Sequence, residues 1–313
     1  MRLIFLGNDP WSVPSLEALA TDPGSDVVLV ITNPPRPAGR GSRLTPTAVA
    51  EAGRRLRVPL LETDGVRRGE GFDAIRNAAP DVLVVVAYGE ILSPEVLGLA
   101  ALGALNVHFS LLPRWRGASP VQHAILEGDP RTGVTIMQID RGLDTGPILA
   151  TSVEDIRPAD DAGSLGTRLA QAGAALLLRT LPPYGSGSLK PAAQPQEGAT
   201  HAPKLGARDR IIDWKRSAQS VAARVRALSP DPGASTRFRG EVLKVLEAQP
   251  SQLPQGGAPA EPGTVVTVDA QGPLIAAGAG SVRLTLVAPS GRRRMSGAEW
   301  ARGARIQPGE PLG

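Results

Sequence analysis

The chain has 313 residues, of which 42% are hydrophobic and 20% are charged, so it can bury a sizeable core and is too apolar for a disordered protein. It contains no cysteine, which excludes disulfides, thiolate metal ligands and cysteine nucleophiles. The net charge of +4 is uneven: residues 1–189 carry −3 and residues 190–313 carry +7, which indicates an anionic partner, such as nucleic acid, or a solvated basic surface.

Apolar runs alternate with helical patterns through the first half of the chain. Residues 82–87 (VLVVVA) contain no polar side chain, which is typical of a strand covered on both faces. Strands separated by helices imply βαβ units, so we predict an α/β, Rossmann-like domain with a parallel-rich sheet. The expected strands are residues 2–7, 26–32, 58–61, 82–87, 104–108 and 133–139, and the expected helices are residues 14–20, 48–56, 72–79, 120–127 and 165–181.

The pattern changes after residue 181. Residues 182–187 and 191–198 are rich in Pro, Gly, Gln and Ser, which is linker composition. Ser217 is a candidate N-cap for a helix through Leu228. Five short β patterns with Gly and Pro turns follow at residues 235–238, 242–246, 264–268, 273–276 and 282–287, and they indicate a small barrel or open sandwich. We therefore expect domains at residues 1–189 and 207–313, joined by a linker at residues 190–206.

The densest candidate site is residues 106–120, NVHFSLLPRWRGASP. Asn106 and His108 are two residues apart on an expected strand, so both side chains project to one face at the carboxyl end, where α/β sheets bind ligands. An amide and an imidazole aimed at one point suit a carbonyl oxygen that gains negative charge. Alternatively, His108 is only a hydrogen-bonded residue at a strand end, but the long loop that follows favours function.

A second motif, DRGLDTG, follows the strand expected at residues 133–139. Asp144 lies near two glycines that permit a tight turn. Its carboxylate is a candidate to orient His108 or to raise the pKa of that imidazole, and the alternative is that Asp144 caps its own turn.

A third motif is the arginine loop, NPPRPAGRGSR, after the second expected strand. Arg36, Arg40 and Arg43 suit phosphate contacts beside a cleft, and the alternative is a disordered surface loop.

Several signatures are missing. No GxGxxG, GxxxxGK[ST] or HExxH occurs, and with three histidines we expect no metal site. No apolar run approaches 18 residues and the first residues lack the form of a signal peptide, so we expect a cytoplasmic protein without a membrane span.

The motif at residues 106–120, together with GVTIMQIDRGLDTGPIL, RPAGRG, VVVAYGEIL and IDW, resembles the folate-dependent formyltransferases along nearly the whole chain. The resemblance implies a Rossmann-like catalytic domain and a C-terminal OB-like β-barrel. It implies 10-formyltetrahydrofolate as donor and the methionyl amine of initiator tRNA as acceptor. We expect a monomer.

The resemblance also implies roles for individual residues. Asn106, His108 and Asp144 match the catalytic positions. The residues expected to bind the folate are Ser110, Leu111, Leu112, Pro113, Val86 and Tyr88, and those expected to bind tRNA are Arg36, Arg40, Arg43, Lys204 and Arg208. Phe109 stands where the family commonly has glycine, which raises the question of whether its ring enters the pocket.

Two other functions fit the motifs. The first is a folate-dependent formyltransferase that acts on a small amine, either an amino sugar or a ribonucleotide, because the Asn, His and Asp set serves that chemistry equally. The second is an RNA-binding protein whose first domain is inactive. The arginine loop and the basic C-terminal region favour tRNA over a small amine, and the intact catalytic set favours an enzyme.

Overall fold

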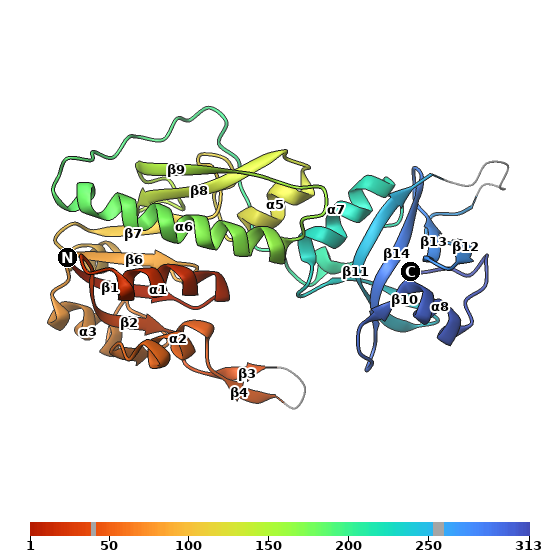
Figure 1. The fold of residues 1–313 in the computed structure, drawn as a ribbon, viewed down its shortest axis with the longest axis horizontal. Coiled ribbons are helices and arrows are strands. Elements are labelled where there is room, and N and C mark those ends of the chain that lie inside the picture. The colour runs from red at the N-terminus through yellow and green to blue at the C-terminus, as the bar shows by residue number, and fades with distance from the viewer. Residues whose placement is uncertain (39–41, 253–259) are drawn as a thin grey trace. The chain divides into compact units, whose positions relative to one another are not determined.

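The computed structural model describes residues 1–38, 42–252 and 260–313 (Figure 1). The chain divides into two compact units. The first comprises Met1–Pro120, Arg131–Asp155 and Gly166–Pro203, and the second comprises Val121–Pro130, Ile156–Leu165 and Lys204–Gly313. Residues 190–203, which make up most of the linker expected at residues 190–206, therefore group with the first unit.

The first unit is built on a seven-stranded sheet with the order β5-β2-β1-β6-β7-β8-β9. The pairs from β5 to β7 are parallel, whereas β7 with β8 and β8 with β9 are antiparallel, so the expected parallel-rich sheet is confirmed. The bounds are β1 Arg2–Gly7, β2 Asp26–Thr32, β5 Leu60–Glu62, β6 Val82–Val86, β7 Ala104–His108, β8 Arg131–Gln138 and β9 Ile148–Asp155.

Helices cover both faces of this sheet (Figure 1). Side chains of β1 and β6 join Ile75 of α3 and Val96 of α4 in one buried cluster. On the other face α6 approaches β7 and β8 closely, since a Cβ added at Gly173 would lie 2.8 Å from Val107 and 3.4 Å from Val134. The bounds are η1 Pro10–Ser12, α1 Val13–Thr21, α2 Ala48–Leu56, α3 Glu70–Ala78, α4 Pro94–Leu97 and α6 Ala162–Gly185. Helix α5, Pro120–Leu126, groups with the second unit from Val121 onward.

Three sequence expectations need correction here. Helix α6 continues through Pro182 and Pro183 into residues expected as linker, because Leu181 and Tyr184 are buried and packing outweighs the helix-breaking tendency of proline. Strand β9 is an addition to the expected strands; it lies at the sheet edge, and Leu149 is its one buried residue. The arginine loop is in part a β-hairpin, in which β3 (Arg36–Ala38) pairs with β4 (Arg43–Thr45).

The second unit contains an antiparallel sheet with the order β10-β11-β14-β13-β12, and β15 pairs with β14. Ser217 caps α7 as expected, and its hydroxyl accepts from Ser220. The C-terminal residues Pro311 and Leu312 bridge Thr264 beside β12 and Phe238 of β10, so the chain end links the two edges of the sheet. The bounds are η2 Arg208–Arg210, α7 Ala218–Leu228, β10 Ala234–Phe238, β11 Glu241–Ser251, β12 Val265–Asp269, β13 Gly272–Ala276, β14 Ser281–Pro289, β15 Met295–Ser296 and α8 Gly297–Ala304.

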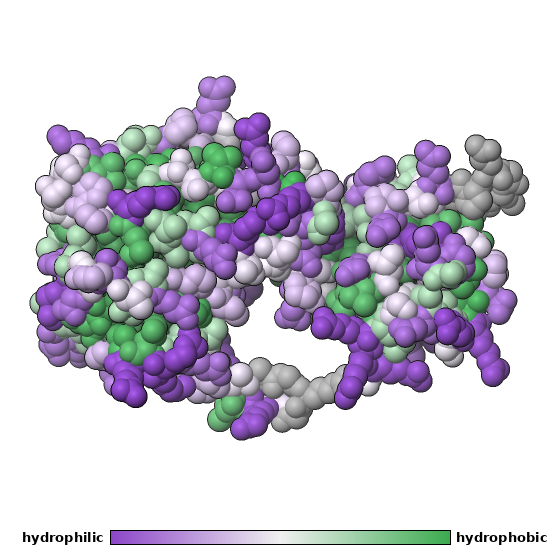
Figure 2. Space-filling model, in the orientation of Figure 1, coloured by the Kyte–Doolittle hydropathy of each residue, from purple (hydrophilic) through white to green (hydrophobic). Residues whose placement is uncertain are grey.

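Hydrophilic and hydrophobic side chains are interspersed on the face shown in Figure 2. The large apolar side chains that are exposed lie in different parts of the chain, among them Leu44 of β4, Leu143 in the turn after β8 and Val153 of β9. Within the described residues, none of the helices combines the length and apolar character needed to span a bilayer.

Candidate active site

Asn106 and His108 lie at the carboxyl end of β7, in the interior of the sheet. Asn106 pairs with Val85 of β6, and His108 pairs with Thr135 of β8. Because side chains alternate along a strand, both point to the same side of the sheet. His108 is 5% exposed and Asn106 is partly buried, so the imidazole is shielded from bulk water while the amide keeps an accessible surface.

Asp144 occupies the turn that joins β8 to β9. Its φ of 52° is left-handed, a conformation that aspartate tolerates better than most residues. The turn is closed by Asp140, whose Oδ1 accepts from the Gly142 amide (2.9 Å) and the Thr145 hydroxyl (2.7 Å). Gly146 is required because an added Cβ would lie 1.8 Å from the Gln138 carbonyl oxygen. Asp140 therefore caps the turn, which leaves the Asp144 carboxylate for other partners.

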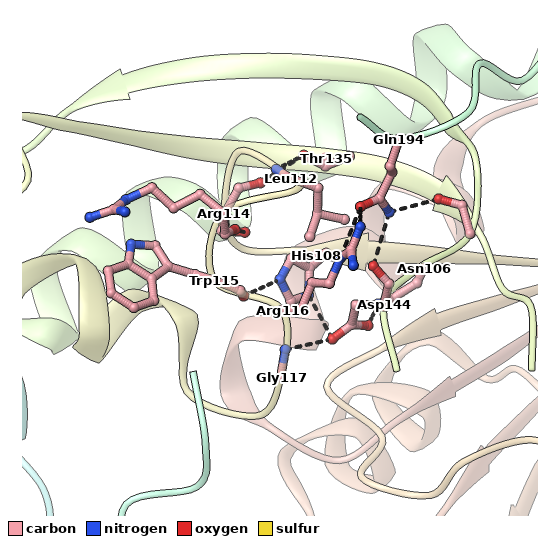
Figure 3. Close-up of polar contacts among 12 residues, drawn as sticks. Asn106, His108, Leu112, Arg114, Trp115, Arg116, Gly117, Thr135, Asp144 and Gln194 are labelled. Carbon is pink, nitrogen blue, oxygen red and sulfur yellow. Dashed lines mark hydrogen bonds and ion pairs between the residues drawn. The ribbon is translucent and has the colours of Figure 1, made fainter. Parts of the chain in front are cut away.

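The structure brings Asn106, His108 and Asp144 together (Figure 3). The Asn106 amide Nδ2 donates to Asp144 Oδ1 at 3.3 Å. The other carboxylate oxygen, Oδ2, accepts from the Gly117 backbone N–H at 2.8 Å and lies 3.7 Å from His108 Nδ1. Asp144, which is 38 positions from Asn106 in the chain, thus meets the two strand residues at one edge of the sheet, as the sequence motifs predicted.

The closest partner of His108 is a backbone group that sequence analysis missed. His108 Nε2 lies 2.9 Å from the Trp115 carbonyl oxygen, in the loop after β7 (Figure 3). A carbonyl oxygen only accepts, so Nε2 carries a proton and Nδ1 is the ring atom that faces Asp144. Trp115 itself has a left-handed φ of 65°. The two ring nitrogens of His108 therefore face different groups, the Trp115 carbonyl at Nε2 and the Asp144 carboxylate, at ion-pair distance, at Nδ1.

The segment Ser110–Pro113 is folded by its own hydrogen bonds. The Ser110 hydroxyl is buried and donates to the Arg114 carbonyl at 2.6 Å. Thr135 on β8 donates its hydroxyl to the Ser110 carbonyl at 2.7 Å and accepts from the Leu112 amide at 3.1 Å. Leu111 is half-buried, and Leu112 is 7% exposed. The Ser110 side chain is therefore committed to the shape of the loop.

Val86 and Tyr88 lie at the carboxyl end of β6. The Val86 carbonyl accepts from the Ser12 hydroxyl at 2.6 Å, and the Tyr88 carbonyl accepts from the Asn8 amide. The Tyr88 hydroxyl is buried, and the Glu90 carboxylate is the polar group that acts on it. Burial first, and the negative charge of Glu90 second, raise the pKa of Tyr88, so the phenol stays neutral and can donate.

Four of the five expected tRNA-binding residues can be placed; these four are exposed and lie apart from this cluster in the chain. Arg36 and Arg43 stand on the paired strands β3 and β4, and Arg36 lies 3.9 Å from Asp64. Arg40 lies outside the described residues. Lys204 and Arg208 are exposed residues of the second unit.

Phe109 does not enter the candidate site. It is 6% exposed, and its ring packs edge to face against Trp11 at a centroid distance of 6.0 Å. Phe109 directly follows β7, the strand from which Asn106 and His108 project. Its ring fills space in the core that a glycine would leave empty.

Gln194 is a further residue that sequence analysis missed. It lies in the segment with linker composition, yet it is buried and bonded to Arg116 and to the backbone of the Asp144 turn. Its own sequence context, PAAQPQEG, contains no signal for this contact. In residues 1–38, 42–252 and 260–313, no group of three or more His, Asp or Glu side chains is placed to bind a metal ion.

Comparison with known proteins places these features in a family. The formyl transferase family model matches residues 1–181, and the model of the formyl transferase C-terminal domain matches residues 204–305. Methionyl-tRNA formyltransferases from Thiobacillus denitrificans and Streptomyces griseus are 43% and 42% identical to the chain over 313 residues, which is the full length of both partners in each comparison.

A solved structure shares the fold. HypX from Aquifex aeolicus in complex with tetrahydrofolic acid is 19% identical, with a TM-score of 0.63 over 96% of this chain and 47% of that one. Because the family models and the full-length relatives agree across both units, the chain belongs to the methionyl-tRNA formyltransferase family of formyl transferases.

Proposed function

We propose that the protein transfers the formyl group of 10-formyltetrahydrofolate to the amino group of methionyl-initiator tRNA. The observation that carries this proposal is the convergence of Asn106, His108 and Asp144 at the carboxyl edge of the sheet, in a chain similar to methionyl-tRNA formyltransferases over its full length. The reaction would take place in the cytoplasm, where translation begins.

The chemistry requires charge stabilisation and movement of one proton. The neutral amine nitrogen forms a bond to the formyl carbon, the bond from that carbon to N10 of the folate breaks, and negative charge develops on the formyl oxygen in between. Asn106 supplies an amide donor for that oxygen, and His108 supplies a second donor when Nδ1 is protonated. Donors aimed at a developing oxyanion in a shielded site stabilise the transition state strongly.

We assign to Asp144 a role in accepting the proton that leaves the amine. Its carboxylate faces both Asn106 and His108 Nδ1, so a proton leaving the amine can pass to Asp144 or His108 and from there to N10. The hydrogen bond from Gly117 fixes the carboxylate in this position. The residues bring no covalent nucleophile, and the transfer needs none.

The donor folate fits the carboxyl end of β6 and the loop after β7. The strand Val82–Val86 is buried along its whole length and offers an apolar wall, and the Tyr88 phenol beyond its end stays neutral and can donate. Because the Ser110 side chain bonds to its own loop, we assign the folate contacts of Ser110–Pro113 to the backbone and to the leucines.

We propose that tRNA phosphates are bound by Arg36, Arg40 and Arg43, by Lys204 and by the basic residues of 207–313. The arginines of β3 and β4 are exposed, as phosphate contacts require.

A direct assay tests the function. The protein is incubated with 10-formyltetrahydrofolate and, separately, methionyl-initiator tRNA, an amino-sugar nucleotide or an aminoribonucleotide. We expect formylmethionyl-tRNA as the product. Formylation of only a small amine would show the alternative enzyme, and no formylation with retained RNA binding would show the inactive binding protein.

A further inference from the structure

The segment of residues 191–203, called the strap below, is bonded to both loops of the candidate site. At its start, Ala192 and Ile148 exchange two backbone hydrogen bonds of 2.7 and 2.8 Å, next to the Asp144 turn. Near its end, Thr200 and Ala202 bond to the loop after β7, where Arg116 donates to the Thr200 carbonyl and accepts from the Ala202 amide. The strap is therefore fixed at two points that flank the candidate active site.

Gln194 lies between these two points, and its side-chain amide accepts two hydrogen bonds and donates two. Its Oε1 accepts from Arg116 Nη2 at 2.7 Å and from Arg116 Nε at 3.1 Å. Its Nε2 donates to the carbonyl oxygens of Asp144 at 2.9 Å and Gly146 at 2.7 Å (Figure 3). One amide thus joins the loop after β7 to the turn between β8 and β9.

Only an uncharged amide satisfies both sides of this contact. Arg116 is 7% exposed and requires an acceptor, whereas the two carbonyl oxygens require donors. A carboxylate at this position would serve Arg116 but would turn its second oxygen toward two carbonyl oxygens. An apolar side chain would leave a buried guanidinium and two carbonyls without partners.

We propose that Gln194 is a positioning residue that holds the Asp144 carboxylate against Asn106 and His108. The Asp144 carboxylate takes one hydrogen bond from the loop after β7, through Gly117, and the Asp144 backbone is held by Gln194. Without the amide, the backbone of the turn loses its hydrogen bonds to the strap, and only the bonds from Gly117 and Asn106 hold the Asp144 carboxylate. This inference rests on the proposed function, since it assigns to Asp144 a part in formyl transfer.

The test compares Gln194→Leu and Gln194→Glu with Gln196→Leu. Gln196 lies in the strap, is exposed and uses only its backbone carbonyl in the contacts of the structure, so it is a matched control. We expect kcat of both Gln194 variants to fall about 10- to 100-fold with KM for tRNA and folate changed less than about threefold, because misplacement of a catalytic group affects the transition state most. A Gln194→Glu variant with the kcat of the parent protein would overturn the proposal, because that variant keeps the Arg116 contact and lacks only the donors to the turn.

A double-mutant cycle separates positioning from general stability. In an Asp144→Asn background, Gln194→Leu should lower kcat by less than about threefold, because the group that it positions is already disabled. An undiminished effect in that background would contradict the proposal.

Hydrogen exchange supplies a readout that does not depend on the reaction. In the folded Gln194→Glu protein, amides of residues 139–147 should exchange faster, with no such change in Gln196→Leu. Unchanged exchange in residues 139–147 would refute the positioning role even if the parent protein formylates tRNA. Faster exchange in a protein that formylates nothing would instead place the failure in the proposed function.

Discussion

The His108 ring nitrogen Nε2 lies 2.9 Å from the backbone carbonyl oxygen of Trp115. Since the carbonyl only accepts, neutral His108 carries its proton on Nε2 and presents a lone pair on Nδ1, the atom 3.7 Å from Asp144 Oδ2. A proton gained during the reaction is therefore received at Nδ1, where the Asp144 carboxylate stabilises the imidazolium.

The tautomer is measurable. In protein labelled with ¹⁵N at histidine, long-range ¹H–¹⁵N correlation at a pH where His108 is neutral should show Nε2 protonated and Nδ1 bare. Assignment of the signal comes from its loss in His108→Gln. A proton on Nδ1 in the neutral ring would contradict this placement of the imidazole.

Thr135 and Thr132, both on β8, allow the contribution of the Thr135 hydrogen bonds to be tested against a matched control. Both are buried, but the Thr135 hydroxyl makes two hydrogen bonds to the loop after β7, whereas the Thr132 hydroxyl has no partner among the described residues. Thr135→Val should lower the free energy of unfolding by about 1–3 kcal/mol and raise KM for the folate, because it leaves a buried carbonyl and a buried amide unpaired. Chemical denaturation and steady-state kinetics check both effects.

Thr132→Val removes a buried hydroxyl that is already unpaired, so its free energy of unfolding should equal or exceed that of the parent protein. Equal destabilisation by the two substitutions would show that the hydrogen bonds of Thr135 contribute nothing specific.

The arginines of the β3–β4 hairpin should affect tRNA alone. Removing Arg36 and Arg43 should weaken tRNA binding and reduce the slope of log K against log salt concentration by about 0.7 to 0.9 for each phosphate that an arginine no longer neutralises, while folate binding stays constant. Filter binding over a salt series, with Arg76→Ala on α3 as the control, measures this. If the slope of log K against log salt concentration is unchanged in the double variant, the hairpin does not contact tRNA phosphates.

The second unit contains a pH-dependent helix cap. At the start of α8, the Ser296 backbone N–H donates to Glu299, and the Ser296 hydroxyl donates as well. These bonds lower the pKa of Glu299, so the stabilisation is complete above the pKa of an unfolded glutamate, about 4.3, and is lost as pH falls through the lower folded value.

Replacement of this residue by Glu299→Gln should therefore lower the midpoint of thermal unfolding at about pH 7, and the difference should shrink toward about pH 3. Calorimetry at both pH values checks the trend. A difference that grows as pH falls would have the wrong sign for this cap.

The positions of the candidate site residues could be predicted from the sequence where they follow a local pattern. Asn106 and His108 are two apart on a strand of regular alternation, and β7 has the expected bounds of Ala104–His108. The glycines around Asp144 indicate a turn in the sequence, and the structure requires a glycine there, as at Gly146. Strand period and turn composition are local properties, so they can be read without knowledge of the fold.

The parts that the sequence did not predict depend on contacts between distant segments. The Trp115 carbonyl is a backbone group, for which no residue type is a signal. Gln194 lies in the segment PAAQPQEG, whose composition indicates a lack of regular structure but not where the segment packs. Tyr184 similarly extends α6 past two prolines because its hydroxyl accepts from Gln138 on β8 and donates to the Leu102 carbonyl.

The most direct test of the central claim is the rate of formyl transfer by Asn106→Ala in a single turnover with bound methionyl-initiator tRNA and 10-formyltetrahydrofolate. Asn77→Ala, an exposed asparagine on α3, is the matched control. We expect Asn106→Ala to fold normally and to transfer the formyl group about 10²- to 10³-fold more slowly than both the control and the parent protein, which is the usual cost of losing one oxyanion donor. A folded Asn106→Ala protein that transfers formyl at the parent rate would contradict the account.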